Sequence, residues 1–317
     1  MALQILFLIM GFFLLIKGAD FFVDGASAFA AKNNVSQIVI GLTIVAFGTS
    51  APELVINAAA SFSGETDISF GNIIGSNIIN IFLILGIAGL IRPLQTEKNT
   101  VWREIPFALL AAAALLVLVN DSILDNSENF LSRSDGIILL LFFIIFITYS
   151  FAIAKVEGQH GPEIKIFSGK RIAAYILIGM AGLILGGQLA VKSAVEIAAA
   201  LGLSSKLIGF TIIASGTSLP ELVTSAVAAY KGKTDIAIGN IVGSNIFNIF
   251  LILAVTALIK PLQYQPVLNI DMAVLLLASL LLFFTMFTGK KRSLDRWEAL
   301  IFIALYTGYL VFLIYRN

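Results

Sequence analysis

Two glutamates stand in the middle of long apolar stretches, where a charged side chain is unusual. The first ends the segment Gly-Thr-Ser-Ala-Pro-Glu at 48–53, and the second ends Gly-Thr-Ser-Leu-Pro-Glu at 216–221. A carboxylate at the centre of a membrane-spanning helix is energetically costly, so such residues usually serve a function. The alternatives are that Glu53 and Glu221 are protonated, or are neutralised by a basic side chain from another apolar segment.

Each glutamate follows a proline, which predicts a break in the helix at that depth. Pro52 and Pro220 have no backbone N–H and clash with the preceding turn. The carbonyl groups of Gly48 and Gly216 therefore lose their intrahelical donor. Broken backbone at membrane depth is tolerated where it lines a site or a cavity. Carbonyl, hydroxyl and carboxylate oxygens together suit a hard cation such as Ca²⁺, which takes roughly six to eight oxygen ligands.

Two further pairs of polar residues lie in the apolar segments that follow. Ser76 and Asn80 are four residues apart, as are Ser244 and Asn248, so each pair shares one face of a helix. We interpret all four as neutral oxygen ligands of the same cation site. Hydrogen bonding between helices is the alternative role, because serine and asparagine also make such bonds within membranes.

The residues beside these pairs are predicted to pack the helices together. Asn77 and Asn245 are assigned a structural role. The same segments carry glycines with the spacing that allows two helices to approach closely. No Walker-type lysine follows them, so phosphate binding is not indicated. These glycines are Gly71, Gly75, Gly239 and Gly243.

The two motif-bearing regions are copies of one another. Residues 41–95 align without a gap to residues 209–263, which lie 168 positions later, and 35 of the 55 aligned residues are identical. Identity at this level indicates an internal duplication. The match does not extend to Asp20 and Asp24, whose repeat partners are not acidic. We expect both aspartates at the membrane interface.

The composition places the whole chain in a membrane. Of its 317 residues, 59% are hydrophobic and only 12% are charged, whereas about a quarter of the residues in a soluble domain are charged. The net charge of +1 gives no basic surface for nucleic acid. The chain has no cysteine, which excludes disulfides and thiolate metal sites.

Apolar stretches long enough to cross a bilayer recur along the chain, and we predict an all-α polytopic membrane protein with ten transmembrane helices. The predicted spans are 2–31, 36–63, 69–91, 102–120, 134–154, 170–200, 204–230, 236–259, 267–288 and 295–315.

Five predicted spans in each copy give the two halves opposite orientations, because five is an odd number. This is the inverted-repeat architecture of secondary transporters, whose binding site lies near the midplane where the repeats meet. We predict a first five-helix repeat over 1–156, a short cytoplasmic linker over 157–169, and a second, inverted repeat over 170–317.

The basic residues are distributed unevenly over the predicted loops. Cytoplasmic loops are enriched in lysine and arginine. One side of the predicted topology carries fourteen of them, and the side of the two termini carries only four. Both termini are therefore predicted outside the cell and the 155–171 loop inside, in a plasma membrane. The four residues are Arg133, Lys206, Lys260 and Arg316.

The doubled motifs resemble a known family. The two GTSxPE segments, each followed by a GSNIxN segment, are similar to the paired alpha-repeats of the calcium/cation antiporter superfamily, in particular its sodium/calcium exchanger branch with bacterial and archaeal members. The resemblance covers essentially the whole chain. It implies antiport of calcium against sodium by alternating access, with the first and sixth helices sliding across a rigid core. No cofactor and no enzymatic activity are implied, and a single subunit in the lipid bilayer suffices for this design.

The resemblance also implies roles for individual residues. It implies that Glu53 and Glu221 hold Ca²⁺ together with the backbone carbonyls of Thr49 and Thr217. It further implies sodium sites formed by the carbonyls of Ala46 and Ala214 and by the hydroxyls of Ser50, Ser76, Ser218 and Ser244.

One position departs from the family pattern and leaves the coupling ion open. Several members have an aspartate at the position of Asn248, whereas this chain has asparagine there and at the matching Asn80. A proton/calcium antiporter and a potassium-dependent antiporter are therefore alternatives to sodium/calcium exchange. A passive cation channel is a further alternative, although inverted repeats with broken helices favour an occluded site. The apolar spans lack the residue pairs of an intramembrane hydrolase.

Overall fold

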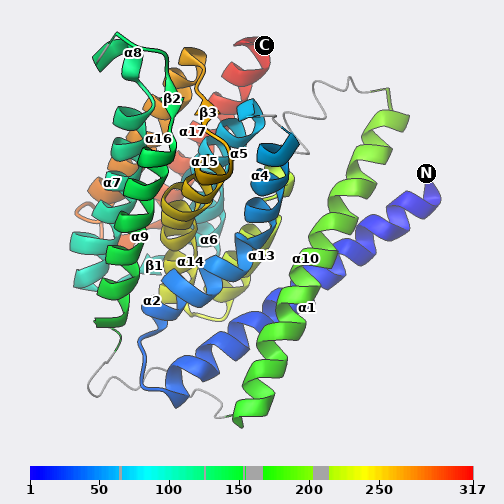
Figure 1. Cartoon of the computed structure of the whole chain (residues 1–317). Helices are drawn as coiled ribbons and strands as arrows, with labels where there is room; N and C mark the ends of the chain where they lie inside the picture. Colours follow the sequence, from blue (N-terminus) through cyan, green and yellow to red (C-terminus); the bar gives the residue numbers. More distant parts are fainter. Residues whose placement is uncertain (64–65, 125, 153, 155–166, 203–213, 317) are drawn as a thin grey trace.

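The computed structural model describes residues 1–63, 66–124, 126–152, 154, 167–202 and 214–316. Within these ranges the ordered structure is helical apart from four two-residue strands (Figure 1). The first half contains α1 (Ala2–Lys32), α2 (Gln37–Ile40), the π-helical turn η1 (Gly41–Val45), α3 (Ala46–Thr49), α4 (Ala51–Ser63), α5 (Thr66–Ile79), the π-helical turn η2 (Asn80–Ile84), α6 (Leu85–Ile91), β1 (Leu94–Gln95), the π-helical turn η3 (Thr100–Glu104), α7 (Ile105–Leu118), α8 (Asp121–Leu124), β2 (Phe130–Leu131) and α9 (Arg133–Ala152).

The second half repeats much of this order. It contains α10 (Gly169–Ala200), α12 (Ala214–Gly216), α13 (Leu219–Tyr230), α14 (Thr234–Phe247), the π-helical turn η5 (Asn248–Leu253), α15 (Ala254–Ile259), β3 (Leu262–Gln263), the 3₁₀ turn η6 (Pro266–Leu268), α16 (Asn269–Thr285), β4 (Ser293–Leu294) and α17 (Arg296–Arg316).

Eight helical segments in the described part of the chain are long and apolar enough to cross a membrane, and one bent pair of helices makes a ninth. These nine coincide with nine of the ten predicted spans. The predicted span 204–230 includes residues 204–213, which lie outside the described residues, and its remainder is α12 and α13. The eight segments are Ala2–Lys32, Ser69–Ile91, Thr100–Leu118, Arg133–Ala152, Gly169–Ala200, Thr234–Ile259, Pro266–Thr285 and Arg296–Arg316.

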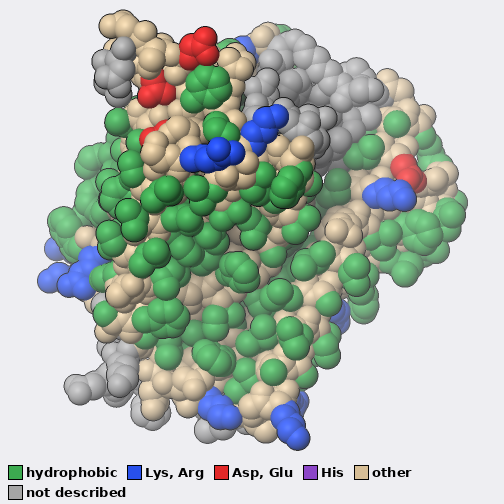
Figure 2. All heavy atoms as spheres, in the orientation of Figure 1, with side chains coloured by type: hydrophobic (Ala, Val, Ile, Leu, Met, Phe, Trp, Pro, Cys, Tyr) green, Lys and Arg blue, Asp and Glu red, His purple; other side chains and the backbone are tan. Residues whose placement is uncertain are grey.

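The surface carries the apolar belt that a membrane protein requires. Figure 2 shows hydrophobic side chains across the middle of the visible face, with most lysines and arginines toward its margins. The helices that form the outside expose large apolar side chains such as Phe13, Leu141 and Leu177. Contact with lipid explains this exposure, because acyl chains are as apolar as these side chains. The all-helical, polytopic membrane class is confirmed.

Two helical segments form the centre of the bundle. The most apolar stretches of Ser69–Ile91 and Thr234–Ile259 are 78% and 83% buried, against 22% for the stretch in α1. Both central segments change from α-helix to π-helix at an asparagine, Asn80 in one and Asn248 in the other. A π-helical turn accommodates an extra residue in the helix and often occurs at a functional site. The central segments therefore form the buried core that carries the Ser and Asn pairs.

α1 and α10 cross one another along one side of this bundle (Figure 1). A Cβ atom at Gly18 would lie 2.7 Å from the backbone N of Leu183, and one at Gly186 would lie 2.7 Å from the backbone N of Leu15. Only glycine fits at such a contact, because a Cβ atom would collide with the backbone of the other helix. The two helices, called the crossing pair below, therefore pack closely as one unit.

Two short antiparallel sheets join loops at the ends of the helices. In one sheet β1 pairs with β4, with Leu94 opposite Leu294. In the other β2 pairs with β3, with Leu131 opposite Leu262. β2 and β3 lie toward the upper end of the bundle in Figure 1 and β1 toward the lower end. Both chain ends lie in the upper half of the same view.

Candidate cation-binding site

The helix breaks predicted at the two prolines are present. α3 ends at Thr49 and α4 begins at Ala51, and the axes of the two halves differ by 47°. Ser50, at the break, has φ −85° and ψ 4°, outside regular helix. In the second half α12 ends at Gly216, and α13 begins at Leu219 with a proline in its first turn.

The crossing pair covers both breaks. A Cβ atom at Gly48 would lie 2.6 Å from Phe22 Cζ of α1, and one at Gly216 would lie 2.5 Å from Val191 Cγ2 of α10. Neither glycine can therefore be enlarged without displacing a side chain of the covering helix. The position of α1 and α10 is thus coupled directly to the backbone that forms the candidate site.

Hydrogen bonds connect each break to the opposite half of the chain. Ser50 Oγ donates to Glu221 Oε1 at 3.0 Å. Thr49 Oγ1 donates to Asn240 Oδ1 at 2.9 Å and lies 3.5 Å from Ser244 Oγ. These contacts bring together five polar side chains from the first break, α13 and α14. They place the first Thr-Ser pair beside the second glutamate.

Thr217 makes the matching contact from the second break. Its Oγ1 donates to Asn72 Oδ1 at 3.2 Å, as Thr49 donates to Asn240 Oδ1. The sequence interpretation missed both of these asparagines, which hold the motif threonines. The sequence did contain a signal for them, because asparagine occupies the matching positions 72 and 240 of the two repeats.

Six predicted ligand side chains have an oxygen atom that is buried and without a hydrogen-bond partner in the described part of the chain. A buried polar atom in that condition is costly unless something outside the protein chain compensates it. All six atoms are oxygens whose lone pairs can coordinate a cation, and none is a nitrogen. The atoms are Glu53 Oε2, Glu221 Oε2, Ser76 Oγ, Ser218 Oγ, Asn80 Oδ1 and Asn248 Oδ1.

The two π-turn asparagines are oriented with their oxygens free. Asn80 Nδ2 donates to Asn245 Oδ1 and Asn248 Nδ2 donates to Asn77 Oδ1, both at 2.9 Å. Because each amide nitrogen is engaged, each amide oxygen is left for another partner. Asn80 and Asn248 thus have the orientation that a cation ligand needs.

Asn77 and Asn245 have the structural role predicted for them. Each donates its side-chain amide to the backbone carbonyl of the other, at 3.2 and 3.3 Å. Together with the contacts of Asn80 and Asn248, these bonds close a reciprocal network between the two central segments. The closely packed glycines predicted beside them are found at Gly239 and Gly243, whose added Cβ atoms would meet the backbone of the Gly41–Val45 turn and its neighbours.

The two carboxylates are enclosed without a basic partner. The side chains of Glu53 and Glu221 are each 1% exposed. None of the ion pairs in the described residues involves either one. The same residues contain no group of three or more His, Cys, Asp or Glu side chains placed to hold a metal ion together. The candidate site therefore consists of two carboxylates surrounded by neutral oxygens.

One of the backbone carbonyls predicted as a ligand already accepts hydrogen bonds within the protein. The carbonyl of Ala46 already accepts hydrogen bonds from Ser50 N at 2.9 Å and Thr49 Oγ1 at 3.3 Å. Ala214 is the first residue of α12, directly after residues that lie outside the description. The structure thus brings Thr49, Ser50 and Ser244 to the neighbourhood of Glu221 and Asn240, while the carbonyl of Ala46 accepts hydrogen bonds from the residues at the bend.

Comparison with known proteins gives consistent matches over the full length. The family model described as sodium/calcium exchanger protein matches residues 3–152 and 171–315. The sodium/calcium exchanger MaX1 of Methanosarcina acetivorans is 34% identical, with 98% of each chain covered. The inner membrane protein YrbG of Escherichia coli is 36% identical over 89% of this chain and 88% of its own. A solved structure of the sodium-calcium exchanger NCX_Mj, soaked with 10 mM Na⁺ and zero Ca²⁺, has 36% identity, covers 98% of each chain and superimposes with a TM-score of 0.84.

Proposed function

The chain belongs to the sodium/calcium exchanger protein family, and we propose that it exchanges calcium for sodium across a membrane by alternating access. The observation that carries this proposal is the set of six buried, unpartnered oxygens around two broken helices. A hard cation compensates such oxygens, whereas a neutral organic substrate would need donors as well as acceptors. Two of the proteins named above, MaX1 and NCX_Mj, are sodium/calcium exchangers and not enzymes, which supports a protein without enzymatic activity.

We assign calcium to the centre of the site. Two carboxylates match the charge of one Ca²⁺, and the neutral oxygens supply the remaining coordination. In this assignment Glu53 and Glu221 bind calcium with the carbonyls of Thr49 and Thr217 and the amide oxygens of Asn80 and Asn248. Sodium occupies positions formed by the carbonyls of Ala46 and Ala214 and the hydroxyls of Ser50, Ser76, Ser218 and Ser244. No resident cofactor is needed, since both ions are cargo.

The proposed architecture is ten helices in two inverted five-helix repeats, over 1–156 and 170–317 with a linker between them. Residues 168 positions apart make equivalent contacts, as in the Gly18–Leu183 and Gly186–Leu15 approaches. The two-residue strands β1 and β3 also match across the repeat and lie toward opposite ends of the bundle. Such reciprocity supports a two-fold relation between the two halves of the chain. In an inverted repeat, the site can open to one side of the membrane and then to the other.

The proposed location is the plasma membrane, with both termini outside the cell. The unequal distribution of lysine and arginine supports this orientation, and an even number of spans puts both termini on one side. The proposed partners are the transported cations and the bilayer. One subunit contains both halves of the site, so we propose a monomer.

Asparagine at both π turns favours a second candidate for the coupling ion. Among the described residues the site carries two carboxylates, and Asn248 adds no charge. Proton/calcium or potassium-dependent exchange is therefore the alternative to sodium coupling. Both alternatives retain the same site and the same antiport mechanism.

Tracer flux tests the proposal directly. The purified protein is reconstituted in liposomes, and radioactive calcium uptake is measured with an outward gradient of sodium, potassium or protons in turn. Sodium/calcium exchange predicts uptake only with the sodium gradient. Uptake with a potassium or proton gradient alone would establish the second candidate. Uptake without any counter-ion gradient would contradict antiport and indicate a channel.

A further inference from the structure

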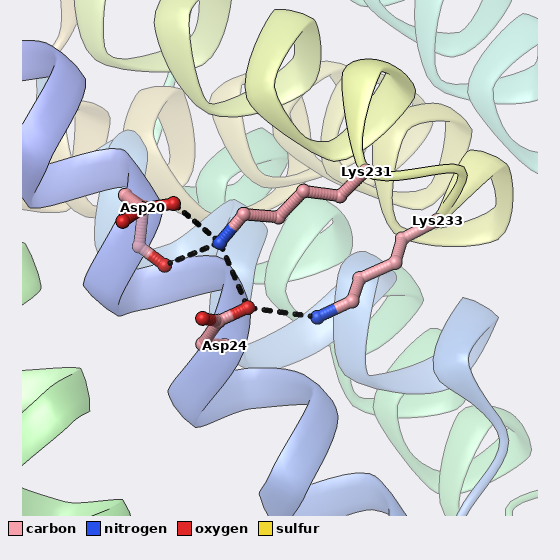
Figure 3. Close-up of polar contacts among 4 residues, drawn as sticks. All are labelled: Asp20, Asp24, Lys231 and Lys233. Atoms are coloured by element: carbon pink, nitrogen blue, oxygen red, sulfur yellow. Dashed lines mark hydrogen bonds and ion pairs between the residues drawn. The ribbon is translucent and has the colours of Figure 1, made fainter. Parts of the chain in front are cut away.

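Four charged side chains connect the crossing pair to the bundle at one end (Figure 3). Lys231 Nζ lies 2.5 Å from Asp20 Oδ1 and 2.8 Å from Asp24 Oδ1, and Lys233 Nζ lies 3.0 Å from the same Asp24 oxygen. Lys231 Nζ also donates to the backbone carbonyl of Asp20 at 3.1 Å. The aspartates belong to α1, and the lysines flank the short turn between α13 and α14. This set is called the ionic cluster below.

The ionic cluster was not expected from the sequence, which suggested only an interfacial position for the two aspartates. The side chains are partly shielded from water, with exposed fractions of 18% for Lys233 and 30% for Asp24. Burial lowers the pKa of the Lys233 ammonium, and the neighbouring Asp24 carboxylate opposes that effect. Partly dehydrated pairs hold their partners more firmly than freely solvated ones do.

The ionic cluster is a specific connection between two units of the fold. Three of the four ion pairs in the described residues belong to it, and the fourth, Arg316 with Asp271, joins α17 to α16 within the bundle. The crossing pair otherwise meets the breaks of the bundle through apolar side chains such as Phe22 and Val191. Apolar surfaces can slide without leaving a charge unpaired, whereas the ionic cluster cannot.

Toward the opposite end of the crossing pair, a cavity lies between it and the second break. Its volume is about 190 Å³, and its walls include Leu8 and Phe12 of α1, Val191 of α10, and Ser215 and Gly216 of the second break. Twelve residues of helix separate Phe12 from Asp24, which is a distance of about 18 Å at about 1.5 Å per residue. Among the described residues, the crossing pair is therefore held to the bundle by ion pairs at one end and lines a cavity beside the second break at the other.

We propose that Asp20, Asp24, Lys231 and Lys233 form an ionic gate that closes the candidate site on the side of Lys231. The four residues act as positioning residues in transport, because they hold α1 and touch no transported ion. The inference rests on the proposed alternating access, in which the two sides open in turn. For the site to face the Lys231 side, α1 must leave the α13–α14 turn, and the three ion pairs must break.

The gate closes only the Lys231 side, because the matching positions of the other repeat carry different residues. The positions matching Asp20 and Asp24 are Gln188 and Lys192, and the position matching Lys231 is Ser63. Only one pair of opposite charge remains at the matching positions, between Lys192 and a residue outside the description. The network of three ion pairs thus favours the state closed on the Lys231 side, and ions bound at the site must overcome this preference during each cycle.

Cysteine accessibility measures this equilibrium without relying on transport. Val23, which precedes Asp24 and lies about one turn after Asp20 on α1, is 0% exposed, and the chain has no cysteine of its own. Val23→Cys is labelled with a membrane-impermeant maleimide from each side of oriented vesicles. Adding Asp24→Asn should raise the labelling rate from the Lys231 side about tenfold, which corresponds to about 1.4 kcal/mol. Lys231→Gln is the second variant and should have the same effect.

Two controls distinguish a gate from a general loss of structure. Lys32→Gln removes a charge at the end of α1 that makes no ion pair with the described residues, and should leave the rate unchanged. Reversing all four charges together (Asp20→Lys, Asp24→Lys, Lys231→Asp and Lys233→Asp) keeps the members of every pair opposite in charge, and should return the rate toward that of Val23→Cys alone. Unchanged labelling in both folded neutralised variants would overturn the gate. Failure of the unmodified protein to exchange calcium would instead overturn the proposed function, whatever the labelling result.

Discussion

Replacing Glu221 with glutamine should remove calcium binding while leaving the surrounding hydrogen bonds intact. Ser50 Oγ donates to Glu221 Oε1 at 3.0 Å, and the amide oxygen of a glutamine can accept the same bond. The glutamate side chain is 1% exposed, so bulk water cannot take over its role. The substitution therefore changes the charge of the site and little else.

The expected loss follows from Coulomb's law. Two unit charges about 4 Å apart attract by about 4 kcal/mol at an effective dielectric constant of about 20, so a divalent ion loses about 8 kcal/mol and a monovalent ion about 4. Part of this loss is offset, because the buried carboxylate no longer has to be dehydrated. If half is offset, about 4 kcal/mol remains for calcium, which weakens its Kd almost a thousandfold.

Calorimetry on the purified variant measures this change, with tracer uptake in liposomes as the functional readout. Glu53→Gln should behave in the same way, because Glu53 has the equivalent position in the first repeat. The matched control is Glu196→Gln on the exposed face of α10, which should bind calcium normally. A calcium Kd within about threefold of the unmodified protein in folded Glu221→Gln would show that this carboxylate does not bind the ion.

Three further changes test other parts of the argument. Gly18→Ala should weaken the crossing pair and lower thermal stability, because its Cβ would lie 2.7 Å from Leu183 N; an unchanged melting temperature would show that α1 and α10 are not closely packed. Asn248→Asp adds a third carboxylate and should change the pH dependence of calcium flux more than its ion selectivity; identical profiles from about pH 5 to about pH 9 would remove this position from the ligand set. A cysteine at Gln159 should react with an impermeant reagent only from the cytoplasmic side, and labelling from outside intact cells would reverse the proposed orientation.

Local sequence predicted the features that depend on local chemistry. Pro52 predicted the break between α3 and α4, since a missing N–H acts within one turn of the helix. The spacing of Ser76 and Asn80 predicted a shared helix face, although the change to a π-helix at Asn80 was not foreseen. Hydrophobic periodicity does not distinguish α from π turns when all sides of a segment are buried.

The sequence did not predict contacts between segments that lie far apart in the chain. The bond between Thr49 and Asn240 joins residues 191 positions apart, and the ion pair between Asp20 and Lys231 depends on where α1 lies against the bundle. The duplication contained a signal for Asn72 and Asn240, which occupy matching positions of the repeat, but the sequence interpretation did not use it. The duplication gave no help for Asp20, where the repeats differ.

The neutral asparagines limit the charge that the proposed site can hold. With Glu53 and Glu221 as its only carboxylates, the empty site carries two negative charges when both are ionised, which one calcium or two sodium ions neutralise. A third sodium ion would leave an unpaired positive charge among groups that are almost entirely buried, where such a charge is far more costly than in water. The free oxygens of Asn80 and Asn248 can share in coordination, but they cannot offset that charge. If exchange does move three sodium ions per calcium, the extra charge must be compensated elsewhere, by water at an open face or by a change in the crossing pair. The charge balance of the site therefore connects stoichiometry to the conformational state in which sodium is bound.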